Sequence, residues 1–269
     1  MEEGCSNANA RILAWSTWTC IRGVGGQRAG AVRGRLTPVR SNGMLVNGSI
    51  MTKARLNTML QRKPTLGLLG RHGQTPTTGA ILPGRASGLY LGDAGRRQAD
   101  AVAQRIARIP SVAAVYTSPL ERARETAAVI ARACRLTLRV DHGLNECDIG
   151  EWTGLPIKRA RRKPEWQLVQ RHPSGFRFPG GESCTEVQAR ITTAIARLVE
   201  QHSGKTIVAV SHADPIKTVI AHALGLHLDL FQRIAVAPAS ITAIVYRPDA
   251  PLVLTVNSMD GDLTWLQIR

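Results

Sequence analysis

From Thr65 onward the chain alternates short apolar runs with longer amphipathic stretches. The apolar runs predict buried strands at 65–70, 112–116, 136–140, 206–211, 241–246 and 252–257. Helical spacing of apolar residues predicts helices at 94–109, 118–133, 185–200 and 214–224, and a polar, basic helical region near 158–171. The alternation predicts an α/β domain over residues 65–269, a three-layer sandwich whose central sheet is mostly parallel.

Ser118 and Pro119 set the expected start of the helix that follows the second strand. Serine is a favourable N-cap, and proline is a favourable first helical residue. Arg122 then lies in the first helical turn, where a cation opposes the helix dipole by ~0.3 to 1 kcal/mol. Its position is therefore easier to explain by binding of an anion than by helix stability.

Residues 1–64 show neither strand nor helical periodicity over any long window. They are rich in Gly, Arg, Asn and Ser and carry ten Lys or Arg against two Glu. We expect a basic, disordered N-terminal extension. Three origins stay open: an unstructured arm, an Arg-rich targeting segment, or upstream codons read from a wrongly assigned start. We favour the last, with Met51 or Met59 as the start.

Composition narrows the class of protein. With 43% hydrophobic and 20% charged residues the chain has the balance of a globular protein, and no apolar run reaches the ~18 residues of a membrane-spanning helix. Its five cysteines are scattered without a CxxC pair, which favours a reducing cytoplasm over a disulfide framework or a zinc ribbon. A net charge of +16 attracts anions, whether nucleic acid, acidic lipid or a phosphorylated small molecule.

Candidate chemistry lies where three of the expected strands end. Arg71-His72-Gly73 follows the first strand, residues 118–122 follow the second, and Ser211-His212 closes the strand 206–211. Because the carboxyl ends of parallel strands meet at one edge of a sheet, we expect these side chains in one pocket. A neutral imidazole can attack a phosphoryl group at physiological pH, and fixed guanidinium groups can bind the oxygens of that phosphoryl group.

These motifs, together with Leu144-Asn145-Glu146, resemble those of the histidine phosphatase superfamily, which has the phosphoglycerate mutase-like fold. The resemblance covers residues 65–258. Three further stretches fit the same register: 91–95, 150–154 and 179–183. The segment 225–231 resembles in particular a bacterial subgroup assigned as phosphomutases.

The resemblance implies a role for each residue of the pocket. His72 is the expected covalent nucleophile, and Glu146 the expected proton carrier. By composition alone, Asp148 or Glu151 could take the place of Glu146. The resemblance also implies a small phosphorylated substrate, no cofactor and no bound metal. The side chains expected to bind the phosphoryl group are Arg71, Arg122, a protonated His212, Gln74 and Thr78.

The sequence departs from the family pattern in ways that bear on the reaction. Thr78 stands where many relatives have asparagine, and Gln74 stands where many have glutamate. Residues 148–154 lack the Arg-His-Tyr-Gly-like stretch with which mutases of the family grip phosphoglycerate. We therefore expect a phosphomonoester hydrolase with a phosphohistidine intermediate, acting on a small phosphorylated metabolite. A phosphoglycerate mutase-type phosphomutase is the alternative.

Residues 158–163 hold five cations in six positions. A solvated helix face is the simplest interpretation, and our sharper hypothesis is that these cations attract a polyanionic substrate. The cluster and the pI of about 10.9 also leave open a nucleic-acid-binding protein on the same scaffold, against which stand the 4% aromatic content and the full set of catalytic groups. We expect no membrane partner, and a homodimer stays open.

Overall fold

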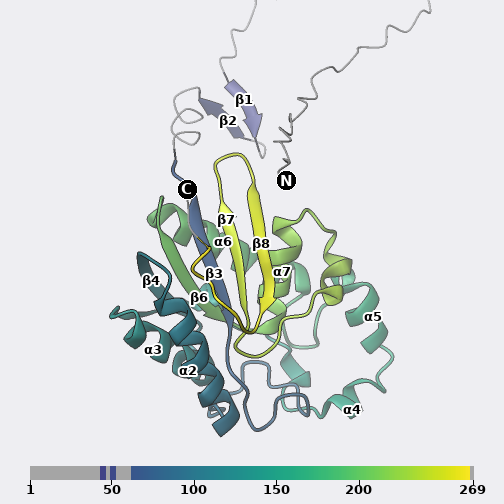
Figure 1. The fold of residues 1–269 in the computed structure, drawn as a ribbon. Helices are drawn as coiled ribbons and strands as arrows, with labels where there is room; N and C mark the ends of the chain where they lie inside the picture. The colour runs from purple at the N-terminus through teal and green to yellow at the C-terminus, as the bar shows by residue number, and fades with distance from the viewer. Residues whose placement is uncertain (1–42, 47–48, 53–61, 267–269) are drawn as a thin grey trace, which may run out of the picture. The chain divides into compact units, whose positions relative to one another are not determined.

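The computed structural model describes residues 43–46, 49–52 and 62–266 (Figure 1). Its main element is a six-stranded sheet of order β5-β4-β6-β3-β7-β8. The strands are β3 (Thr65–Arg71), β4 (Val112–Thr117), β5 (Leu138–Val140), β6 (Thr206–Ser211), β7 (Ile241–Tyr246) and β8 (Pro251–Ser258). β5, β4, β6 and β3 are parallel, whereas β7 runs antiparallel to both of its neighbours. The predicted mostly parallel sheet and closing hairpin are thus confirmed.

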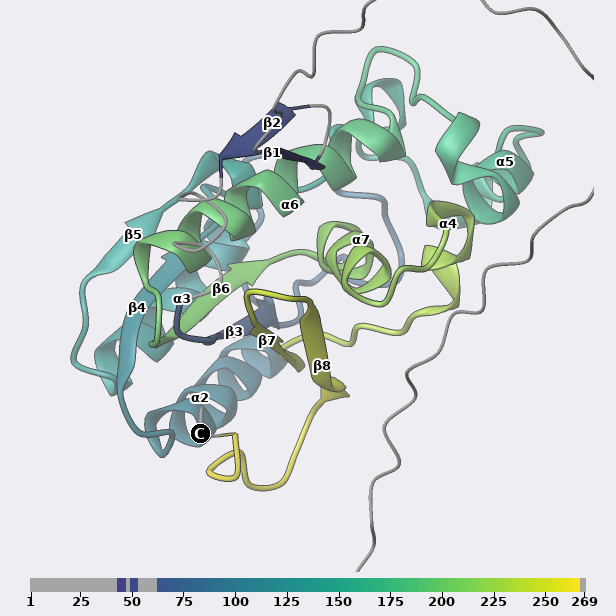
Figure 2. The same ribbon diagram turned by 90° about the horizontal axis from the view of Figure 1, so that it is seen from above.

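Helices cover both faces of this sheet (Figure 2). α2 (Asp93–Ala107) and α3 (Glu121–Ala133) pack on one face, and α6 (Cys184–Gln201) and α7 (Ala213–Ala223) on the other. The predicted apolar faces are the buried ones: Ala99, Val102, Ala103 and Ile106 on α2, and Val187, Ile191, Ile195 and Leu198 on α6. The α/β three-layer sandwich is confirmed.

The basic region near 158–171, predicted to be helical, forms two short helices. α4 (Ile157–Ala160) and α5 (Trp166–Arg171) are separated by Pro164, whose ring cannot continue a helix. Both lie beside a separate aromatic cluster, in which Trp152 stacks on Trp166 at a centroid distance of 6.4 Å. Four 3-10 turns complete the described elements: η1 (His142–Leu144), η2 (Gly150–Trp152), η3 (Pro173–Gly175) and η4 (Leu228–Arg233).

The predicted start of α3 is wrong. The helix begins at Glu121, with Leu120 at the N-cap and no capping side chain. Ser118 lies outside the helix because its Oγ is 2.8 Å from His212 Nε2 and also accepts a hydrogen bond from the Leu120 amide. Arg122 remains in the first helical turn.

Most of the expected extension 1–64, including Met59 and any disorder of its first 42 residues, lies outside the described residues. Within it, β1 (Gly43–Val46) pairs antiparallel with β2 (Ser49–Thr52), although the sequence shows no strand periodicity there. The domain boundary at residue 64 stays a prediction. Over the described part of the chain, no helix has both the length and the apolar character that a membrane span requires.

Candidate active site

The sheet brings the two histidines together. Arg71 is the last residue of β3 and pairs with Ser211, the last residue of β6. The amide of His72 then donates to the carbonyl of Ser211 at 3.1 Å, and the next residue along is His212. The His72 and His212 rings lie 5.1 Å apart between centroids, at an angle of 60°. The parallel register thus places both imidazoles at one edge of the sheet, as predicted.

His72 is held with one ring nitrogen free. Its Nδ1 lies 2.7 Å from the carbonyl oxygen of Gly73, and because a carbonyl can only accept, Nδ1 carries the proton. Nε2 therefore holds the lone pair. Burial, and then the nearby charges of Arg122 and Arg71, lower the pKa of His72 to about 3. The ring is neutral at physiological pH, which is the form that a nucleophile requires.

Two arginines, the buried Arg122 and the half-buried Arg71, flank this ring, and each has at least one guanidinium nitrogen without a partner among the described residues. Arg122 is fully buried, and only its Nη2 is bonded, to the carbonyl of Gly84 at 2.8 Å. Arg71 donates from Nη1 to the carbonyl of Val236 at 2.7 Å. Arg122 Nε, Arg122 Nη1 and Arg71 Nε are buried and unpartnered within the described part of the chain. Burial lowers the pKa of both arginines, because surroundings of low polarity disfavour the charged guanidinium.

His212 lies between Ser118 and Glu146. Its Nε2 is 2.8 Å from Ser118 Oγ, and its Nδ1 is 3.7 Å from Glu146 Oε2, without a hydrogen bond. Burial, followed by the charges of His72 and Arg122, lowers its pKa well below the ordinary value. The protein's own groups thus favour a neutral ring. The protonated His212 expected from the sequence requires a bound phosphoryl dianion to raise that pKa.

The fold brings the carboxyl group of Glu146 beside His212. Burial, and then the charge of Asp214, raise the pKa of Glu146 to about 7, and its Oε1 accepts a hydrogen bond from the Cys147 amide at 2.9 Å. Asp148 instead bonds the Gly150 amide and pairs with Arg85, and Glu151 is exposed. Of the three acids left open by composition, Glu146 is the one beside His212.

The loop after His72 contains the last two expected phosphate-binding residues. Thr78 Oγ1 accepts from the Thr75 amide at 2.9 Å and lies 3.0 Å from Thr75 Oγ1, so this hydroxyl shapes the loop. The backbone of Gln74 bonds Gln98 and Gly92. A contact of either side chain with phosphate stays a prediction.

Two glycines let α2 approach this loop. A Cβ on Gly95, in the first turn of α2, would lie 1.9 Å from the Gln74 carbonyl oxygen. A Cβ on Gly73 would lie 2.5 Å from the carbonyl oxygen of Gly95. Backbone therefore packs on backbone behind His72, and neither position has room for a side chain.

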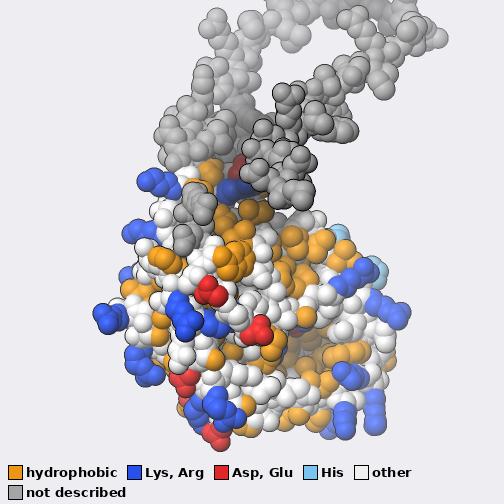
Figure 3. All heavy atoms as spheres, in the orientation of Figure 1, with side chains coloured by type: hydrophobic (Ala, Val, Ile, Leu, Met, Phe, Trp, Pro, Cys, Tyr) orange, Lys and Arg blue, Asp and Glu red, His pale blue; other side chains and the backbone are white. Residues whose placement is uncertain are grey.

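The basic cluster 158–163 lies on and just after α4. All five of its cationic side chains are exposed, and Figure 3 shows Lys and Arg side chains gathered over this part of the molecule. Its segment is joined to the active-site loop, since the Ile157 amide donates to Ala80 and the Leu82 amide to Leu155. The loop that follows His72 therefore lies next to the cluster.

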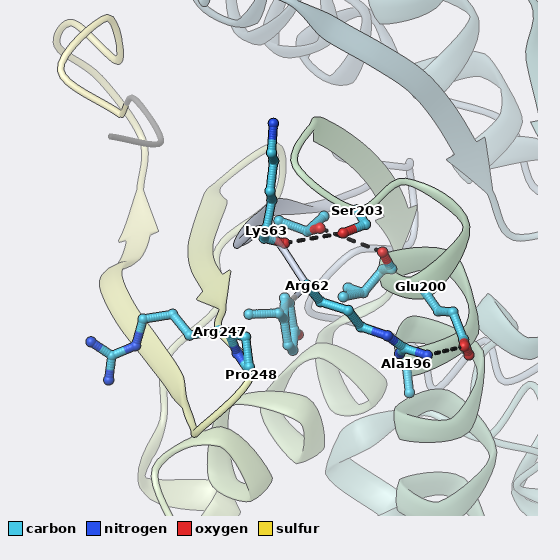
Figure 4. Close-up of a pocket in the computed structure, with 10 residues that line it drawn as sticks. Arg62, Lys63, Ala196, Glu200, Ser203, Arg247 and Pro248 are labelled. Atoms are coloured by element: carbon cyan, nitrogen blue, oxygen red, sulfur yellow. Dashed lines mark hydrogen bonds and ion pairs between the residues drawn. The ribbon is translucent and has the colours of Figure 1, made fainter. Parts of the chain in front are cut away.

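A second pocket lies at the opposite, amino edge of the parallel strands (Figure 4). Its lining includes Thr65 at the start of β3 and Tyr246 at the end of β7. Arg62 is paired there with Glu200, and Ser203 donates to the Lys63 carbonyl at 3.3 Å. None of the residues expected to act on phosphate lies in this pocket.

Three side chains that the sequence did not single out support Glu146: Arg85 and Arg190 bond its backbone carbonyl, and Glu182 bonds both arginines. The stretch 179–183, which contains Glu182, marked only the family register. No group of three or more His, Cys, Asp or Glu side chains among the described residues is arranged to hold a metal ion.

The model of the histidine phosphatase superfamily (branch 1) matches residues 68–259. The chain belongs to this superfamily of phosphatases and phosphoglycerate mutase-like enzymes, as its motifs predicted, and it is an enzyme of that class.

Curated relatives include phosphatases and mutase-like proteins. Phosphoserine phosphatase 1 of Hydrogenobacter thermophilus is 30% identical over 179 residues, which are 65% of this chain and 84% of that one. A bifunctional protein of Mycobacterium tuberculosis is 36% identical over 196 residues, 72% of this chain and 54% of that one. The chain thus spans about half the length of the first relatives that it matches.

Solved structures agree with the fold. The mycobacterial glucosyl-3-phosphoglycerate phosphatase superposes with a TM-score of 0.66 at 26% identity, covering 73% of this chain and 100% of that one. A phosphoserine phosphatase of Entamoeba histolytica, solved with phosphoserine, gives 0.66 at 28% identity and covers 73% and 98%.

Proposed function

We propose that the chain hydrolyses phosphomonoesters of small metabolites through a phosphohistidine at His72 Nε2. The observation that carries the proposal is the set of unpartnered buried nitrogens on Arg71, Arg122 and His212 around a neutral imidazole. Buried guanidinium donors without partners are costly, and a phosphoryl group supplies the acceptors that they lack. The relatives that act on phosphoserine and on glucosyl-3-phosphoglycerate support a small phosphorylated substrate.

In the first step the lone pair of His72 Nε2 attacks phosphorus and the ester P–O bond breaks. Arg71 and Arg122 bind the equatorial oxygens, on which negative charge is spread, and supply positive charge there. Glu146, whose pKa of about 7 keeps it substantially protonated near neutrality, gives its proton to the leaving alkoxide. The products are an alcohol and phosphohistidine.

In the second step water attacks phosphorus and the P–N bond breaks. Glu146, now a carboxylate, accepts the proton of the water. Inorganic phosphate leaves, and His72 returns to its neutral form.

Hydrolysis is favoured over phosphomutase activity by the segment after Glu146. Ile149 and Trp152 point into the aromatic cluster and are buried, and residues 147–154 contain no Lys or Arg. A mutase has to hold a second anionic group while excluding water, and this segment offers no cation for that purpose.

The test compares wild type with His72→Ala in EDTA, using para-nitrophenyl phosphate turnover and labelling with a radioactive phosphate ester that is quenched in alkaline denaturant. We expect metal-independent turnover and an acid-labile, base-stable label in wild type, and a loss of turnover of at least ~10⁴-fold in the variant. The control is His222→Ala, which removes an exposed histidine at the end of α7 and should change neither readout. A wild-type enzyme that only exchanges phosphoryl groups between alcohols would identify a mutase, and one that takes up no label would refute the phosphohistidine.

A further inference from the structure

The peptide carbonyl of Glu146 is held by two guanidinium groups. Arg85 Nε donates to this oxygen at 2.8 Å, and Arg190 Nη2 donates to it at 3.2 Å. Arg190 also bonds the carbonyls of Gly143 and Asn145, each at 3.0 Å. The backbone that carries Glu146 is therefore fixed by side chains from two distant parts of the chain.

Glu182 joins the two arginines. Its Oε1 lies 2.8 Å from Arg85 Nη2 and 3.0 Å from Arg190 Nε, while Oε2 is 3.0 Å from Arg190 Nη2. Oε2 also accepts from the Asp148 amide at 3.0 Å. The side chain of Arg85 is 30% exposed, that of Arg190 22% and that of Glu182 19%, so water screens these contacts only in part.

Arg85 differs from Arg190 because its own loop reaches the phosphate pocket. The preceding residue, Gly84, accepts the hydrogen bond from Arg122 Nη2 at 2.8 Å. Gly84 has φ of +46°, and a Cβ there would lie 2.7 Å from Ile149 Cγ1. Two consecutive residues thus bind the buried arginine on one side and the backbone of the acid on the other.

We propose that Arg85 is a positioning residue for proton transfer, which fixes Glu146 relative to the phosphoryl group held by Arg122. The proposal rests on the proposed function. An acid displaced by even a fraction of an ångström protonates the leaving oxygen less well, while binding of the phosphoryl group is unaffected. The effect of losing Arg85 therefore depends on how much the leaving group needs the proton.

The experiment measures kcat/KM for substituted phenyl phosphates of increasing leaving-group basicity, from para-nitrophenyl to unsubstituted phenyl phosphate. Arg85→Met removes the contacts with the Glu146 carbonyl, Glu182 and Asp148 while keeping a side chain of similar length. We expect kcat/KM to fall at least ~10-fold more for phenyl phosphate than for para-nitrophenyl phosphate, since general acid catalysis is worth ~10²- to 10⁴-fold in full. Arg85→Lys should recover part of this difference.

The matched control is Arg177→Met, in which the lost arginine pairs with Glu186 and the Gly181 carbonyl but not with Glu146. We expect no change in leaving-group dependence. A double-mutant cycle with Glu146→Gln is the second measurement, because Arg85→Met should cost little more once the acid is gone. Thermal unfolding confirms that each variant is folded.

Equal losses for all leaving groups, or full additivity in the cycle, would refute the positioning role and leave Arg85 as a structural contact of its loop. Such a result would leave the phosphatase proposal intact, because wild type would still turn over. If wild type hydrolysed none of the esters, the proposed function would fail, and the role of Arg85 with it.

Discussion

Arginines at the two ends of the parallel strands have opposite surroundings. At the carboxyl edge Arg122 is fully buried, with two guanidinium nitrogens that lack any partner in the described structure. At the amino edge Arg62 is 39% exposed and paired with Glu200 (Figure 4). A paired, solvated cation needs no ligand, whereas a buried and unpartnered one is stable only because the surrounding fold compensates for its cost. Whether an arginine has hydrogen-bond and ion-pair partners in the protein, more than its charge alone, distinguishes a binding site from a basic surface.

The largest expected contrast comes from replacing one arginine at each end. Arg122→Met should lower kcat/KM ~100- to 1000-fold, the effect of losing one donor to a transition-state oxyanion. It should leave thermal stability unchanged or raise it, because it removes a buried charge that makes no ion pair within the described part of the chain and has two unbonded nitrogens. Arg62→Met should leave kcat/KM unchanged. If Arg122→Met and Arg62→Met lowered kcat/KM equally, the distinction between a phosphate-binding edge and a solvated edge would be refuted.

The pH dependence sharpens the comparison within the carboxyl edge. For a basic leaving group, kcat should fall ~10-fold per pH unit above about pH 7, as Glu146 ionises, and Glu146→Gln should abolish this fall.

The same carboxyl group affects stability. Because the native pKa of Glu146 is raised from 4.5, its contribution to stability is complete below pH 4.5 and is lost as pH rises to about 7. The loss is at most ~3 kcal/mol. Denaturant unfolding between pH 4 and 8 checks it, and Glu146→Gln should remove this part of the slope.

The smallest effect is expected at the basic cluster, whose cations are all exposed. Replacing Arg159, Arg161 and Arg162 by Gln should raise KM several-fold for a multiply phosphorylated metabolite at low salt, and should not affect para-nitrophenyl phosphate. The control changes three exposed arginines elsewhere to Gln: Arg108, Arg132 and Arg135. An unchanged KM would leave the cluster as a solvated surface.

The sequence predicted best where local pattern and burial agree. Strands 206–211 and 241–246 have the predicted bounds because most of their side chains are buried, which gives continuous apolar runs. The start of α3 was wrong because Ser118 is engaged by His212, 94 residues away, and no local rule contains that contact. The strands β1 and β2 were not predicted, because their residues show no strand periodicity in the sequence.

The candidate site follows the same division. That His72, Arg71, Arg122 and His212 lie together could be predicted, because each stands at the end of a strand or a few residues after it, in a recognisable motif. The role of Arg85 could not be predicted, because its partners Glu146 and Glu182 lie 61 and 97 residues away in the sequence and Arg85 belongs to no motif. The neutral state of His212 likewise depends on burial and on charges brought together only by folding.

The close packing of Gly73 against Gly95 has a consequence for mutational tolerance. Gly95 belongs to a helix and carries no group for chemistry, yet even alanine there would push the Gln74 carbonyl and, through it, the loop that presents His72. A variant library made to broaden substrate range should therefore keep both glycines and diversify Ser87, Leu89 and Tyr90, whose exposed or half-buried side chains can change without this constraint.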